Sequence, residues 1–153
     1  MTNADLLHYR LINQQIADSA FTKPSEIVGW MGAMQSQEYA LAKWAIGLRL
    51  PELVDKDVEK AFNDGGILRT HVLRPTWHFV TPADIRWMLT LTAPRVLAVS
   101  ASMFRKLELD EAVFKRSYQT LIKTLKGGNQ LTRVALKAAL ERARITAVGL
   151  RLG

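Results

Sequence analysis

The spacing of apolar residues along this chain predicts a mainly helical protein with one short β segment. Apolar positions recur at three- and four-residue intervals through most of the chain, which is the period of an amphipathic helix. Prolines and glycines mark most of the boundaries between these stretches. The predicted helices cover residues 3–17, 24–34, 38–50, 56–63, about 83–103, 110–126 and 133–143.

The period changes between residues 67 and 80. ILRTHV at 67–72 and TWHFV at 76–80 are rich in β-branched and aromatic residues, and Leu73-Arg74-Pro75 between them is suited to a turn. This pattern predicts a two-stranded β-hairpin. On a two-residue period Trp77 and Phe79 share one face, which we expect to be core, and Thr76 and His78 share the other.

Residues suited to capping mark several helix starts. Asp55 and Thr132 each precede a predicted helix, and TPAD at 81–84 combines a hydroxyl, a proline and a first-turn carboxylate. Pro94 lies inside the helix that follows, and we expect it to kink or break that helix. The four tryptophans all have apolar neighbours, so core packing is the expectation for each.

Helices followed by a short hairpin form the order of a winged helix-turn-helix, with the hairpin as the wing. We therefore predict a winged-helix domain at residues 1–105. Residues 106–153 offer two more helices and no second hairpin, which predicts the start of a partial second unit of the same kind. The chain is expected to be the N-terminal part of a longer protein.

Composition narrows the class of protein. Apolar residues make up 48% of the 153 positions, enough for a packed core, and there is no cysteine, which excludes disulfides and thiolate metal sites. No apolar run approaches the ~18–20 residues of a membrane span, and the N-terminus lacks the features of a secretory signal. We expect a cytoplasmic protein, associated with the nucleoid through DNA and not with a membrane.

The net charge of +7 is concentrated in the second half of the chain. Residues 1–80 hold 8 Lys and Arg against 9 Asp and Glu, whereas residues 81–153 hold 13 against 5. A basic second half favours a polyanion as binding partner, and double-stranded DNA is the partner we expect. A well-solvated helical surface would produce the same imbalance, so charge alone leaves both interpretations open.

Two glutamines one residue apart, Gln35 and Gln37, lie within a largely apolar stretch. A primary amide in such surroundings needs hydrogen-bond partners or costs a few kcal/mol. The pair therefore has either a structural role, capping a helix–helix junction, or a chemical one. The residues alone favour the structural role.

Two blocks of sequence resemble one family, the winged-helix DNA glycosylases of the alkylation-repair type. The first block is GAMQSQEY at 32–39 with AKWAIGLR at 42–49. The second is RTHVLRPTWHFV at 69–80, leading into DIRW at 84–87. The resemblance extends more weakly along the whole chain. Family members are considerably longer. The resemblance therefore implies that this chain covers the first winged helix and part of the second.

In that family a glutamine–any–glutamine motif is associated with catalysis, and one branch has aspartate at the second polar position. Gln37 stands there in this chain, so the resemblance is to the glutamine branch. It implies that Gln35 and Gln37 are catalytic in removing N-alkylated bases; some members also unhook interstrand crosslinks. Glu38 is the nearest carboxylate, but its neighbouring position should direct it elsewhere, and helix capping is its expected role.

The chemistry of an amide pair restricts the substrate. Cleaving the glycosidic bond of a neutral base usually needs an acid and a carboxylate. A base alkylated on a ring nitrogen is already cationic, so it leaves without an acid. Amide carbonyls can then accept a hydrogen bond from a bound water and stabilise positive charge on the sugar, although they are not bases at neutral pH. The pair therefore suits cationic lesions.

The expected DNA contacts come from the hairpin and the helix after it. Arginines in a wing commonly touch phosphate or the minor groove, and the face with His78 could turn toward the glutamines or toward phosphate. The candidates are Arg69, Arg74, Thr76, His78 and Arg86. Three scattered histidines give no metal-ligand spacing, so neither a metal nor another cofactor is expected. The alternative function is a non-catalytic winged-helix DNA-binding or regulatory domain.

Overall fold

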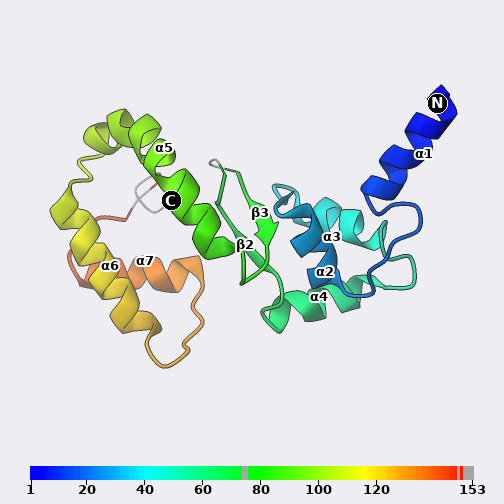
Figure 1. The fold of residues 1–153 in the computed structure, drawn as a ribbon. Helices are drawn as coiled ribbons and strands as arrows, with labels where there is room; N and C mark the ends of the chain where they lie inside the picture. Colours follow the sequence, from blue (N-terminus) through cyan, green and yellow to red (C-terminus); the bar gives the residue numbers. More distant parts are fainter. Residues whose placement is uncertain (74–75, 148, 150–153) are drawn as a thin grey trace. The chain divides into compact units, whose positions relative to one another are not determined.

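The computed structural model describes residues 1–73, 76–147 and 149 of the chain. Its elements are α1 (Asn3–Asn13), α2 (Pro24–Met31), β1 (Met34–Gln35), α3 (Tyr39–Gly47), α4 (Asp55–Asn63), β2 (Leu68–Thr70), β3 (His78–Val80), α5 (Ile85–Lys106), α6 (Glu111–Leu125) and α7 (Arg133–Arg142) (Figure 1). The predicted class, mainly α with a small β component, is confirmed. The winged-helix arrangement stays a prediction.

The sheet has three antiparallel strands in the order β1-β3-β2, not the two strands of the predicted hairpin. The additional strand β1 lies where the sequence predicts the last turn of a helix. Helix α2 ends at Met31, where Gly32 adopts φ +71° and ψ −64°, a positive-φ conformation that favours glycine and turns the chain out of the helix. Met34 and Gln35 then pair with β3.

Capping residues fix several of the predicted helix ends. The Thr132 hydroxyl accepts from the Ala135 N–H at 3.3 Å, and Gly127 follows the end of α6 with φ +84°. The sequence predicted Asp55 as the cap of α4, but Asp55 is the first residue of that helix. Val54 occupies the cap position, and its N–H donates to the Asp57 carboxylate at 2.9 Å.

Helix α5 continues through Pro94, so of the two expected effects of the proline, a kink or a break, the break does not occur. The proline removes one N–H from the helix, and the carbonyl left without it belongs to Thr90, an exposed residue that water can reach. The helix also meets the length and hydropathy criterion for a membrane span, with a mean hydropathy of 1.2 and 6% of its window buried. The sequence expectation of no such run is therefore wrong. Length and composition alone do not make a helix a membrane span, and Arg95 near the middle of α5 would be costly inside a bilayer.

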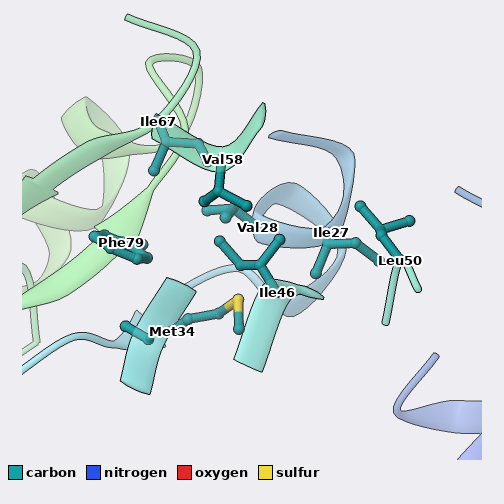
Figure 2. Packing of buried hydrophobic residues seen from close by; sticks show 9 residues of the cluster. Ile27, Val28, Met34, Ile46, Leu50, Val58, Ile67 and Phe79 are labelled. Atoms are coloured by element: carbon teal, nitrogen blue, oxygen red, sulfur yellow. The ribbon is translucent and has the colours of Figure 1, made fainter. Parts of the chain in front are cut away.

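The main core is built by α2, α3, α4 and the sheet. Figure 2 shows Ile27 and Val28 of α2 packed against Ile46 of α3, Val58 of α4 and Phe79 of β3. All five are at most 3% exposed. Burying side chains of this size contributes roughly 1.5–3 kcal/mol each. The core therefore fixes the sheet, and with it the segment that contains Gln35.

The tryptophans depart from the expected core packing. Trp30, Trp44 and Trp87 are 53–65% exposed, and Trp77 is half-buried. Phe79, on the same predicted face as Trp77, does enter the core. The pattern of neighbouring apolar residues was misleading because each helix has one side toward the core and these indoles lie on another.

Contacts within the chain divide it into two compact units, residues 1–96 and 97–153, with the boundary inside α5. In the first unit a smaller cluster on the sheet contains Val72, Val80 and Met88. In the second unit, Leu140, Ile145 and Ala147 pack against half-buried residues of α6. The predicted domains at 1–105 and 106–153, as winged-helix units, stay a prediction.

Candidate active site

The central strand β3 brings the two sequence blocks of the resemblance together. His78 lies directly opposite Gln35 of β1 on one side and Thr70 of β2 on the other. Residues directly opposite in an antiparallel pair point to the same face with their Cβ atoms about 4.5–5.5 Å apart. Gln35, His78 and Thr70 therefore form one cross-strand row, here called the polar row.

The opposite face of the sheet anchors this row. Met34 and Arg69 lie directly opposite Phe79 in the same registers, and Met34 and Phe79 are core residues. Because side chains alternate along a strand, burial of Met34 and Phe79 forces Gln35 and His78 to the other face. The neighbouring core thus sets the direction in which the first glutamine points.

Both glutamine side chains are exposed, and neither caps a helix. Gln37 precedes α3, whose cap residue is Glu38, and the Glu38 side chain makes no capping hydrogen bond. The Gln37 Oε1 atom instead accepts a long hydrogen bond of 3.4 Å from the Trp77 N–H. A carbonyl oxygen has two lone pairs, so this contact leaves acceptor capacity on the Gln37 amide.

Arg69 holds the backbone of the glutamine segment. Its Nε and Nη2 donate to the Ser36 carbonyl at 3.1 and 2.9 Å, and Nη2 also donates to the Gln37 carbonyl at 3.2 Å. Its Cζ lies 4.8 Å from the centre of the Trp77 ring and 5.5 Å from that of Tyr39. As it lies here, the guanidinium is directed to the protein's own backbone.

His78 is buried, with 4% of its surface exposed. Its Nδ1 lies 2.9 Å from the Thr76 carbonyl oxygen. Since a carbonyl can only accept, Nδ1 carries the proton in this contact, which fixes the ring's orientation in the row. The Thr76 hydroxyl itself is buried and has no hydrogen-bond partner within the described part of the chain, as is also true of the Ser36 hydroxyl.

A charged network supports α3 beside the site. Lys43 bridges Asp55 at 2.9 Å and Glu59 at 2.5 Å, and the Tyr39 hydroxyl donates to Glu59 at 3.1 Å. The hydrogen bond to Lys43 holds the pKa of Glu59 below its usual value. Burial, and then the contact with Glu59, raise the pKa of Tyr39. Tyr39 therefore stays neutral, with its ring fixed against Arg69.

The structure brings Gln35, Gln37, Arg69, Thr76 and His78 into one set of contacts around the start of β3. Arg86 is exposed on the first turn of α5, and no described contact joins its side chain to that set. Arg74 lies outside the described residues. No group of His, Asp or Glu suited to a metal ion occurs in residues 1–73, 76–147 and 149.

Sequence reasoning did not single out three residues at this site. Ser36 supplies the carbonyl that Arg69 binds, Tyr39 supports the guanidinium, and Trp77 contacts both Arg69 and the His71 ring at 4.1 Å. The signal available in the sequence was the occurrence of Tyr39 and Trp77 in the two blocks that also hold Arg69, because aromatic rings commonly stack on guanidinium groups.

A family model described as "DNA glycosylase AlkZ-like" matches residues 28–151, which include the glutamine segment, the sheet and most of the chain beyond it. The chain belongs to this family of AlkZ-like DNA glycosylases. The membership confirms the resemblance drawn from the two sequence blocks, and it indicates DNA as the partner and a hydrolase of DNA repair. Neither the curated proteins nor the solved structures contained a match to the chain.

Proposed function

We propose that this chain acts as a monofunctional DNA glycosylase that hydrolyses the N-glycosidic bond of cationic, N-alkylated bases in double-stranded DNA. Gln35 and Gln37 are the catalytic residues of this proposal. The observation that carries it is the pair of exposed carboxamides, of which Gln35 is set by the sheet register beside His78. The family membership supplies the reaction class.

The proposed mechanism requires little from the protein beyond positioning. The alkylated base carries a positive charge and leaves with the glycosidic electron pair, so no acid has to protonate it. The carbonyl oxygens of Gln35 and Gln37 accept from the attacking water and face the developing oxocarbenium ion, which their dipoles stabilise. Water adds to the anomeric carbon and its proton passes to solvent, since an amide cannot retain it at neutral pH.

DNA binding is proposed through a winged-helix arrangement, with the β2–β3 segment as the wing. Arg86 is exposed in the first turn of the following helix and suits a phosphate contact. Arg74 falls in the turn outside the described residues, and its phosphate contact is part of the same proposal. Thr76 and His78 support the segment that carries the glutamines. We propose a cytoplasmic location with access to DNA.

The test is release of 7-methylguanine from methylated duplex DNA by the wild-type chain and by two variants. Gln35→Ala and Gln37→Ala are each expected to lower the single-turnover rate by about 10²–10³, the loss typical of a transition-state dipole. Gln130→Ala removes an exposed glutamine far along the chain from the site and serves as the matched control. Uracil-containing DNA, with a neutral base, should release nothing.

One result would favour the alternative function. A wild-type chain that binds DNA tightly but releases no methylated base would argue for a non-catalytic winged-helix module.

A further inference from the structure

The backbone hydrogen bonds between the glutamine segment and the residue before β3 are incomplete on one side. The Ser36 N–H donates to the Trp77 carbonyl at 2.7 Å. In a regular antiparallel pair of this kind the Trp77 N–H would donate back to the Ser36 carbonyl. It donates instead to the Gln37 side chain, at 3.4 Å. One ladder bond has thus been exchanged for a bond to a proposed catalytic amide.

Arg69 accounts for this exchange. Two of its N–H groups occupy the Ser36 carbonyl, at 2.9 and 3.1 Å, so that carbonyl is satisfied without Trp77. A third contact, to the Gln37 carbonyl at 3.2 Å, fixes the backbone from which the Gln37 amide extends. Charge-assisted bonds of this kind are roughly twice as strong as neutral ones, so the guanidinium outcompetes a backbone N–H for the Ser36 oxygen.

We infer that Arg69 is a positioning residue for Gln37. It binds the carbonyls of Ser36 and Gln37, leaves the Trp77 N–H to the Gln37 side chain, and so sets the orientation of that amide. The inference concerns the geometry of the segment, and only its consequence for catalysis rests on the proposed function. It replaces, for Arg69, the phosphate contact expected from the sequence.

The arrangement requires arginine. A planar guanidinium can donate to two carbonyls in a fixed geometry while its faces contact the rings of Trp77 and Tyr39. A lysine would keep the charge but would present a mobile point donor without a flat face. Arg69→Lys is therefore the informative change. Arg10→Lys, on the exposed face of α1, is the matched control.

The first measurement does not depend on activity. Hydrogen exchange followed by NMR reports whether the Trp77 N–H is bonded, and the Ile46 N–H in the α3 core reports global opening. Gln37→Ala is expected to lower the protection of the Trp77 N–H by roughly five- to tenfold when Arg69 is present, the loss of one weak hydrogen bond. In the Arg69→Lys background the Ser36 carbonyl is free to accept from the Trp77 N–H, so Gln37→Ala should change its protection by less than about twofold. The Ile46 protection should stay within about twofold of wild type, and Arg10→Lys should change neither.

The second measurement separates positioning from DNA binding. In Arg69→Lys the single-turnover rate of 7-methylguanine release at saturating enzyme should fall about tenfold, while the Kd for the same DNA stays within about twofold. A phosphate contact would behave differently. Because lysine keeps the charge, that contact is removed in Arg69→Gln, which would then weaken DNA binding and lower the salt slope by about one, with the saturated rate unchanged.

The outcomes distinguish the two proposals. An equal loss of Trp77 protection on Gln37→Ala in the wild-type and Arg69→Lys backgrounds overturns the positioning role, as does an equal loss of protection at Ile46, which would mean general destabilisation. So does the phosphate-contact pattern. If the wild-type chain releases no base but the effect of Gln37→Ala on Trp77 exchange depends on Arg69, the glycosylase proposal fails for this chain and the positioning role stands.

Discussion

At the scale of single residues, Arg49 is the most constrained charged side chain outside the candidate site. It is 7% exposed, and its described contacts all go to carbonyl oxygens: Nε to Gln14 O at 2.8 Å, Nη1 to Ala45 O at 2.7 Å and Nη2 to Gln14 Oε1 at 3.2 Å. Gln14 caps the end of α1 and Ala45 lies in the last turns of α3. A cation between two helix C-termini satisfies carbonyls that the helices cannot.

Replacing Arg49 by methionine tests this role. The thioether keeps most of the apolar stem but leaves the Gln14 and Ala45 carbonyls without their donor, so we expect the free energy of unfolding to fall by about 2–3 kcal/mol. Urea denaturation with an unchanged m-value would measure it. Arg10→Met, at an exposed site, should cost less than about 1 kcal/mol. Equal losses in the two variants would contradict a special role for Arg49.

The contribution of Glu38 is the second residue-level question, because it is the carboxylate next to the glutamines. The sequence indicates that it caps or extends the third helix; it does occupy the cap position of α3, but its exposed side chain makes no capping hydrogen bond. Since a cationic leaving group needs no acid, we expect Glu38→Gln to keep release of 7-methylguanine within about threefold of wild type. A loss as large as that of Gln37→Ala would mean that a carboxylate takes part and would remove the argument for cationic substrates.

At the scale of elements, α3 and α4 are joined by the network of Lys43, Asp55, Glu59 and Tyr39 on top of their apolar contact. Lys43 is 11% exposed along its side chain, more sheltered than an ordinary surface lysine. Its hydrogen bonds to Glu59 and then to Asp55 raise its pKa. The network fixes α3, whose first residue Tyr39 contacts Arg69.

Because of this network, we expect the free energy of unfolding to depend on pH in the acidic range. The Lys43 contact lowers the pKa of Glu59 from 4.5, so the folded state binds its proton less readily than the unfolded state. The resulting stability is fully present above 4.5 and is lost as the pH falls through the lowered value. We expect the unfolding free energy of wild type to fall from about pH 6 to pH 3 more steeply than that of Glu59→Gln. Glu52→Gln, in an exposed turn, should follow wild type; parallel curves for all three would contradict the network.

The elements that local signals specify were predictable, and those that depend on distant pairing were not. The Thr132 hydroxyl caps the start of α7, and Gly127 follows the end of α6 with a positive φ. Both helix ends agree with the prediction from sequence. Strand β1 has two residues and exists only through pairing with β3, more than forty positions away. No local pattern distinguishes such a strand from the last turn of a helix.

The same division applies to the candidate site. The sequence left open whether His78 faces the glutamines, faces phosphate or is a structural histidine. The register places it directly opposite Gln35, and its side chain is buried. The engagement of Arg69 with the Ser36 carbonyl, across 33 positions, could not be predicted, because side-chain donors to an irregular backbone leave no periodic signal. A wing arginine therefore looked like a phosphate contact.

At the scale of the whole molecule, the charge follows the division into two units. Residues 97–153 hold 11 Lys and Arg against 4 Asp and Glu, a net charge of +7. The whole chain also has a net charge of +7, so the charges of residues 1–96 cancel. Not every cation of the basic unit is available to DNA. Arg116 donates to the Ala143 carbonyl at 2.9 Å, and Lys137 pairs with Glu141 at 3.6 Å. The glutamine pair and the whole of the excess charge thus lie in different units.

This separation predicts that affinity and catalysis can be altered independently. Lys115, Lys123 and Lys126 are exposed on or just after α6, and changing all three to glutamine removes up to three phosphate contacts. Each contact contributes about 0.9 to the slope of log K against log salt, so the slope should fall by as much as roughly 2.7. Fluorescence anisotropy between about 50 and 200 mM salt would measure this slope on methylated and on unmodified duplexes. Binding to the two duplexes should weaken equally, since phosphate contacts do not read the lesion.

The matched control is Lys56→Gln, which removes an exposed cation from the neutral unit and should leave the slope unchanged. The saturated single-turnover rate of the triple variant should stay within about twofold of wild type, because the polar row and Arg69 are untouched. A slope that does not move would mean that the excess charge of the second unit is ordinary solvated surface. DNA affinity would then have to come from the first unit, where Arg86 beside the sheet is the exposed cation to test next.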